Sequence, residues 1–212
     1  MHLTRIITAR AIWLFDLEEL NPRGRRTDPI LEATKARYQF EQAGPGENNR
    51  GFIFKNGTFS ATDALIIDSL EVYQDGVVLT TRSDTDDSDL ILEDLLAWLC
   101  ADMRMGVEGF SLIPTRRYLS ELVISWPNSS LEGGLGTLLN IKDWIEEAAS
   151  IEKGSIEAQA IVFGFGSSEK RNAFTLERKL NEPYSAHKFY SSAAMKTKTH
   201  LELLTKVTTM LA

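Results

Sequence analysis

The chain has 212 residues, of which 43% are hydrophobic and 25% are charged, with 14 glycines and 6 prolines. This composition is typical of a globular chain and excludes collagen-like and disordered proteins. A single cysteine excludes a disulfide framework, and no apolar run reaches the roughly 18 residues that a membrane-spanning helix requires. The first residues lack a signal-peptide pattern, so we expect a cytoplasmic protein without a membrane partner.

The formal net charge of −7 is unevenly distributed along the chain. Residues 63–102 hold eleven acidic residues against a single Arg82, a local charge of −10, and the rest of the chain carries +3. Residues 21–37 and the last thirty residues each contain more basic than acidic side chains. Opposite fields steer association and fix its register, so this asymmetry suggests head-to-tail self-association or a basic partner. The alternative is that the charged segments are solvated faces of an ordinary acidic protein. The candidate interface residues are Asp84, Asp86, Asp87, Glu93, Asp94, Arg23, Arg25, Arg26, Lys196 and Lys198.

The first part of the chain has the pattern of β-strands. Residues 10–17 are rich in β-forming side chains, and apolar residues alternate over 36–40, so each segment predicts a strand. Between them, the Pro- and Gly-containing segment 21–29 is a polar break. Two hairpins follow, one turning at Asn56-Gly57 and one at Asp75-Gly76, because these dipeptides supply the positive φ of tight turns.

The period of the apolar residues then changes from two to between three and four. Leucines spaced by three and four residues predict a helix from residue 89 to 103, with Ser83, Thr85 and Asp86 as cap candidates. A strand over 118–126 and a second helix over 131–149 follow.

Three further strands are predicted near the end of the chain. They cover residues 160–166, 174–180 and 187–191. The strand over 160–166 is predicted to be buried. The last helix opens with a capping box from Thr199 to Glu202.

Strands that precede interspersed helices predict an α+β fold. We expect a mostly antiparallel or mixed sheet of about eight strands with three helices and a strand-rich N-terminal part. Residues 1–212 are expected to form a single domain. The weaker alternative is a β-rich subdomain over 1–83 and an α+β subdomain over 84–212.

The acidic run from Asp84 to Asp89 resembles the opening of a calcium loop. Its sixth position is Asp89 where glycine is required, and its twelfth is Leu95 where a bidentate glutamate is required. A helix N-terminus explains the same acids without a ligand. We therefore predict no metal site, and Asp84, Asp86, Asp87 and Asp89 are the candidates if one exists.

No complete catalytic or cofactor motif is present. The histidines, His2, His187 and His200, lack zinc-ligand spacing, and His200 is expected at the surface or as a cap residue. A catalytic triad that includes His187 or His200, with partners distant in sequence, remains an alternative. Cys100 is expected in the core, and Gly133 to Thr137 lacks the ending of a phosphate-binding loop. We therefore expect no catalytic residue and no cofactor.

These observations favour a non-enzymatic interaction or assembly protein. It would associate with itself, as a homo-oligomer, or with a protein partner through its acidic and basic segments. The first alternative is a metal-dependent hydrolase or nuclease that uses the carboxylate cluster. The second is a nucleic-acid-binding protein that uses Arg23, Arg25 and Arg26, which is less favoured because the chain is acidic.

Overall fold

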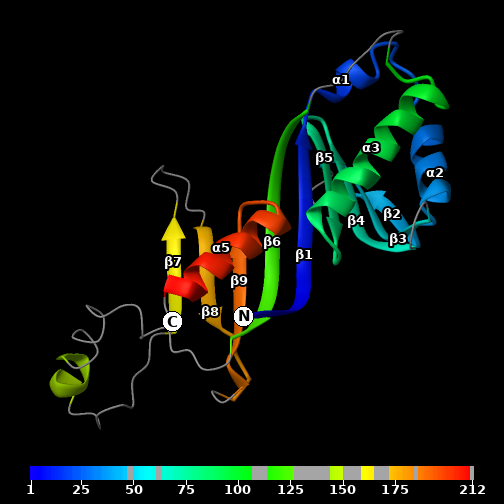
Figure 1. The fold of residues 1–212 in the computed structure, drawn as a ribbon. Helices are drawn as coiled ribbons and strands as arrows, with labels where there is room; N and C mark the ends of the chain where they lie inside the picture. Colours follow the sequence, from blue (N-terminus) through cyan, green and yellow to red (C-terminus); the bar gives the residue numbers. More distant parts are fainter. Residues whose placement is uncertain are drawn as a thin grey trace. The chain divides into compact units, whose positions relative to one another are not determined.

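The computed structural model describes residues 1–46, 50–60, 64–106, 114–126, 144–149, 159–164, 172–183 and 186–210 (Figure 1). The helices are α1 (Leu17–Leu20), α2 (Asp28–Arg37), α3 (Thr85–Ala101) and α5 (Thr197–Met210), and residues 144–149 are also helical. The strands are β1 (His2–Leu14), β2 (Gln42–Pro45), β3 (Phe52–Phe59), β4 (Leu65–Tyr73), β5 (Gly76–Thr81), β6 (Thr115–Ser125), β7 (Ala160–Gly164), β8 (Asn172–Arg178) and β9 (Lys188–Ala193).

The protein has a strand-rich α+β fold, as predicted, with a large antiparallel sheet. Hydrogen bonding orders its strands β2-β3-β4-β5-β1-β6-β9-β8-β7. The prediction of about eight strands and three helices is slightly low, because the described residues alone form nine strands and five helices. The predicted helix over 131–149 lies outside the described residues except for 144–149.

The chain divides into two compact units, each of which is described by itself. The α3 unit comprises Thr8–Ser120 and Met195–Thr197. The α5 unit comprises Met1–Ile7, Glu121–Ala194 and Lys198–Ala212. The strands β1 and β6 contribute residues to both units. The single-domain organisation stays a prediction.

In the α3 unit, α2 and α3 pack on the strands through one apolar core (Figure 1). The helix α3 supplies Ile91, Leu92, Leu95 and Leu99, which confirms the predicted spacing by three and four residues. Its cap differs from the prediction: the side chain of Asp84 accepts the backbone N–H of Asp86, because Asp84 is the extended residue before the first turn.

The hairpin between β4 and β5 confirms the prediction at Asp75-Gly76. Tyr73 pairs with Gly76, so Gln74 and Asp75 form the two-residue turn. Gly76 has a φ of +144°, a conformation that side-chain-bearing residues rarely adopt. The next strand in the sheet, β1, pairs antiparallel with β5 and places Leu14 opposite Gly76.

The predicted hairpin at Asn56-Gly57 is wrong, because both residues lie inside the continuous strand β3. Lys55 pairs with Ser69 and Gly57 pairs with Ile67, so the register of β3 with β4 continues across Asn56, which has a φ of +53°. The same tolerance of positive φ that suits Asn to a turn suits it to this position in the strand.

Gly57 is required for packing. A Cβ atom at Gly57 would lie 2.4 Å from the ring of the buried Phe40. We expect Gly57→Ala to lower the free energy of unfolding by about 2 kcal/mol, since overpacking a core costs about 1–3 kcal/mol. Urea unfolding measures the loss. Gly44→Ala, where a Cβ meets nothing within 4 Å, is the matched control, and equal effects of the two variants would contradict the packing role.

The predicted strand over 36–40 is also wrong. Residues up to Arg37 belong to α2, which has Pro29 in its first turn, and Gln39 follows with a φ of +51°. Of the alternating residues, Tyr38 and Phe40 are buried, whereas Ala36 is exposed on α2. A helix C-terminus followed by a turn produced the alternation instead of a strand.

In the α5 unit, β9, β8 and β7 form an antiparallel meander with α5 packed on it (Figure 1). The helix α5 begins at Thr197, two residues before the predicted capping box. The strand β7 is less buried than predicted, with Val162 51% exposed and Phe163 62% exposed. It is the last strand in the sheet order, so it pairs with β8 alone among the described strands.

Candidate functional site

The acidic residues of α3 are largely paired within the α3 unit. Asp86, Asp89 and Glu93 are spaced by three and four residues, which places them on one face of the helix. Lys196 Nζ lies 2.6 Å from Asp86 Oδ1, and Arg116 Nη2 lies 3.2 Å from Glu93 Oε1. The folded chain thus brings the predicted charges Lys196 and Asp86 against each other.

Asp89 is the centre of this network and is only 6% exposed. Its Oδ1 accepts the indole N–H of Trp13 at 2.9 Å, and its Oδ2 accepts the hydroxyl of Tyr118 at 2.8 Å. Lys196 Nζ lies 2.9 Å from the same Oδ2. A buried carboxylate held by two neutral donors and one ammonium is a structural anchor.

Two cation–π contacts add to the interactions around Asp89. The Arg116 guanidinium lies 4.1 Å from the centre of the Trp13 ring, and the Lys196 ammonium lies 4.9 Å from the centre of the Tyr118 ring. The hydrogen bond to Asp86, and then the bond to Asp89, raises the pKa of Lys196. Lys196 is therefore a cation throughout the neutral pH range.

Asp94 forms a second charged contact in the α3 unit. Arg37 Nη2 donates to its Oδ1 at 2.9 Å, and the hydroxyl of Tyr38 donates to its Oδ2 at 2.6 Å. The guanidinium also lies 5.2 Å from the Trp98 ring. Burial, and then the bond to Asp94, raises the pKa of Tyr38, so its hydroxyl stays a donor.

Of the carboxylates considered for a metal, Asp86 and Asp89 share the ammonium group of Lys196. Asp84 caps α3, Asp86 pairs with Lys196, Asp89 is the buried anchor, and Asp87 is half-buried. Across the described ranges, no three Asp, Glu, His or Cys residues are grouped as metal ligands would be.

The basic loop 21–26 is held in one shape by its own first residue. The Asn21 side chain accepts the backbone N–H of Arg25 and donates to the Arg25 carbonyl, both at 3.0 Å. The Arg25 guanidinium donates to the Met103 carbonyl at 2.9 Å. Arg23 and Arg26 are exposed, and Arg26 contacts only the equally exposed Asp28, at 3.4 Å, among the described residues.

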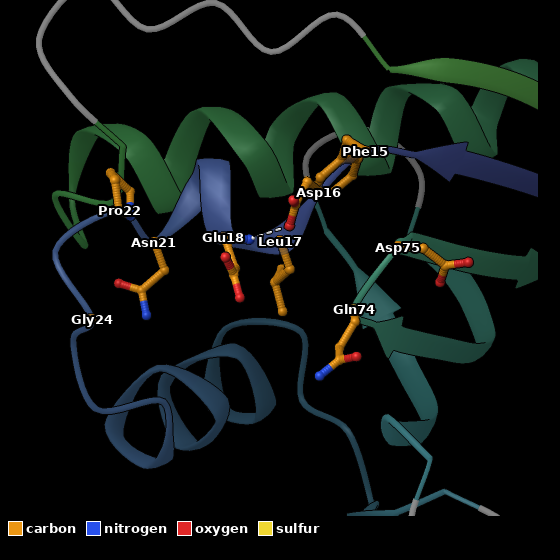
Figure 2. A pocket seen from close by; sticks show the side chains of 9 residues that line it. All are labelled: Phe15, Asp16, Leu17, Glu18, Asn21, Pro22, Gly24, Gln74 and Asp75. Atoms are coloured by element: carbon orange, nitrogen blue, oxygen red, sulfur yellow. Dashed lines mark hydrogen bonds between the residues drawn. The ribbon is translucent and has the colours of Figure 1, made fainter.

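An open hollow of about 900 Å³ lies beside this loop (Figure 2). Its lining residues come from the end of β1, from α1, from the basic loop and from the β4–β5 turn; they are Phe15, Asp16, Leu17, Glu18, Asn21, Pro22, Gly24, Gln74 and Asp75. The backbone N–H groups of Phe15 and Leu17 donate to the carbonyls of Asp75 and Gln74, at 3.1 and 2.9 Å. These bonds hold the walls of the hollow together.

The hollow is acidic and its neighbouring loop is basic. Asp16 caps α1 by accepting the Glu18 N–H at 2.9 Å. Figure 2 shows the Glu18 and Gln74 side chains projecting into the space between α1 and the turn, with the Asp75 carboxylate directed away from them in this view. The sequence analysis missed these residues. The available signal was the pairing of β1 with β5, which brings the end of β1 beside the β4–β5 turn.

His200 is buried, so the prediction of a surface or cap position is wrong. Its Nε2 lies 2.8 Å from Ser191 Oγ, and both residues are 0% exposed. The Ser191 hydroxyl donates to the Thr175 carbonyl at 2.7 Å, so the imidazole N–H is the donor to Ser191. If His200 were the general base of a catalytic triad, its Nε2 would accept the proton of the Ser191 hydroxyl. Here Nε2 carries a proton and donates it to that hydroxyl instead.

The lining of the hollow does not include Lys198 or Cys100. Lys198 is exposed on α5, and burial raises the pKa of the half-buried Cys100 thiol. Gly133 to Thr137 lies outside the described residues. Among the described helices, none has the length and apolar character needed to cross a membrane.

Comparisons with known proteins identify no family. No family model matches the sequence, and no curated protein matches it. Among solved structures, the chain is similar to Methanococcus jannaschii TBP, with 10% identity over 98% of this chain and 97% of that one, at a TM-score of 0.46. This likeness is too weak to support an argument about function.

Proposed function

We propose that this chain is a non-enzymatic assembly protein that associates with a second copy of itself. The proposed interface is the loop–hollow patch, which consists of Arg23 and Arg26 on the basic loop and the hollow that contains Asp16 and Glu18. We retain the inference of a cytoplasmic protein, which rests on the single Cys100.

One observation carries the proposal: the exposed arginines stand on a loop that is already ordered. The bonds between Asn21 and Arg25 fix the loop before any partner arrives. Association then loses less conformational entropy, and a preorganised surface binds more tightly for the same contacts. By contrast, Asp86, Glu93 and Asp94 already have cationic partners, so we give them no part in the interface.

A second copy is the favoured occupant because the patch is complementary to itself. In a two-fold dimer the same surface meets on both sides, so each contact of residue i with residue j is repeated as j with i. Pro22 and Gly24 form part of the wall of the hollow, which places the basic loop directly beside the acids. Each copy can therefore present its arginines to the acidic hollow of the other.

We expect Arg23→Glu combined with Arg26→Glu to abolish the dimer. Opposed like charges cost several kcal/mol, so the dissociation constant should rise at least about a hundredfold. Light scattering gives the molar mass. The wild-type dimer should also dissociate between about 0.01 and about 1 M salt, as the Debye length falls from about 30 to about 3 Å.

The matched control is Arg50→Glu combined with Lys55→Glu. Both residues are exposed in the α3 unit, and the change in net charge is the same. The control should remain dimeric. A wild-type monomer at every salt concentration would reject the proposal. Duplex DNA bound by a wild-type monomer and released by the Arg23/Arg26 variant would favour the nucleic-acid alternative instead.

A further inference from the structure

A second hollow, of about 160 Å³, lies at the β8–β9 end of the α5 unit. Its lining residues are Gln159, Arg178, Lys179, Leu180, Asn181, Glu182, Pro183 and Lys188. It belongs to a different unit from the loop–hollow patch and does not depend on the proposed assembly. The volume has room for several water molecules, and hence for one tetrahedral anion.

The charges around this hollow are mainly positive. Lys179 Nζ and Lys188 Nζ lie 3.0 and 3.2 Å from the same oxygen, Oε1 of Glu182. Arg178 adds a third cation, with its guanidinium 5.3 Å from the centre of the Phe189 ring. The lining therefore includes three cationic side chains and one carboxylate.

The backbone fixes where these cations stand. Arg178 is the last residue of β8, and its N–H donates to the Gln159 carbonyl at 2.9 Å. The Lys179 N–H donates to the carbonyl of Lys188, the first residue of β9, at 3.1 Å. Both lysine side chains are about one-third exposed, so their ammonium groups remain within reach of solvent.

We propose that this hollow binds a phosphate group, as free phosphate or as a small phosphomonoester. A phosphate carries a charge of about −1.5 to −2 at pH 7, which matches the site better than a single carboxylate does. Each lysine has three N–H donors and gives one to Glu182, so two on each stay available for phosphate oxygens. Glu182 holds both ammonium groups in place while the site is empty and competes with the ligand for them.

Titration calorimetry of the full chain with inorganic phosphate tests the site. We expect one site per chain with a dissociation constant on the order of 1 mM, and tighter binding of phosphate than of acetate. Phosphoserine as a second titrant distinguishes the phosphomonoester from the free ion, since added contacts to the rest of the molecule would tighten its binding.

Two variants should move the affinity in opposite directions. Lys188→Met removes one charge-assisted contact and should weaken binding about tenfold. Glu182→Gln removes the competing carboxylate and should tighten binding about fivefold. The controls are Lys206→Met and Glu202→Gln, because both residues are exposed on α5 and the charge changes are the same.

The outcomes separate a binding site from a structural ion cluster. Tighter binding by Glu182→Gln with unchanged affinity in both controls supports the site, even if Lys188→Met fails to fold. Binding absent from both wild type and Glu182→Gln at about 20 mM phosphate, twentyfold above the expected constant, would overturn it. Equal weakening by Lys188→Met and Lys206→Met would also overturn it, because the effect would then come from net charge.

Discussion

Replacing Asp89 by alanine should lower the free energy of unfolding by about 4 kcal/mol, a large share of the roughly 5–15 kcal/mol that stabilises a typical domain. The carboxylate is buried and accepts hydrogen bonds from Trp13 and Tyr118 while it faces Lys196. Its removal leaves the buried indole N–H without this acceptor and the ammonium without its most buried counter-charge. Urea unfolding monitored by tryptophan fluorescence measures the loss.

Two variants separate the parts of this effect. Asp86→Ala removes the exposed partner of the same Lys196 and should cost only about 0.5 kcal/mol, since exposed ion pairs contribute little. Asp89→Asn keeps an oxygen for the Trp13 N–H and should lie between the two. If Asp89→Ala cost no more than Asp86→Ala, Asp89 would not be the anchor of α3.

Replacing Gly76 by alanine should cost about 3 kcal/mol and is the largest effect expected from a single added methyl group. Gly76 has a φ of +144°, and a Cβ there would lie 2.1 Å from the Trp13 carbonyl oxygen and 2.9 Å from Leu14 Cα. Both neighbours are backbone atoms of the paired strand β1, so relief requires separation of β1 from β5. Thermal and urea unfolding measure the loss.

Gly24→Ala is the control for backbone conformation. Gly24 also has a positive φ, +57°, but a Cβ there meets nothing within 4 Å. This variant should cost about 1 kcal/mol, the strain of a left-handed residue alone. A Gly76→Ala variant as stable as Gly24→Ala would show that the contact between β5 and β1 adapts to the methyl group.

Elements set by local periodicity could be predicted from the sequence. The leucine spacing of α3 and the Asp75-Gly76 turn are local signals, and both are confirmed. The Asn56-Gly57 signal is equally local, but the pairing of β3 with β4 and the packing of Phe40 against Gly57 place both residues inside a continuous strand. Positive φ was correctly anticipated at Asn56, whereas the path of the strand depends on residues far along the chain.

The charged contacts could not be predicted because their partners are distant in sequence. Trp13 and Asp89 are 76 residues apart, and Lys196 and Asp86 are 110 apart. Charge counting correctly identified acidic and basic segments, and pairing inside the fold then removed Asp86, Glu93 and Asp94 from the set of free charges. The acids of the hollow were missed because Asp16 and Asp75 come to line the same hollow only through the pairing of β1 with β5.

A charge-swap experiment tests the proposed assembly most directly. One variant carries Arg23→Glu and Arg26→Glu, so both its loop and its hollow are acidic. The other carries Glu18→Lys, Gln74→Lys and Asp75→Asn, at three exposed lining residues of the hollow (Figure 2), so Asp16 is the one acid left in the lining and its loop and hollow are both basic.

Sedimentation velocity should find each variant monomeric when it is alone, because each patch then meets its own charge. An equimolar mixture should form a heterodimer, since the acidic loop of one faces the basic hollow of the other at both contacts of the two-fold interface. Two variants that remain monomeric when mixed, or a dimer that persists in either variant alone, would contradict assembly through the loop–hollow patch.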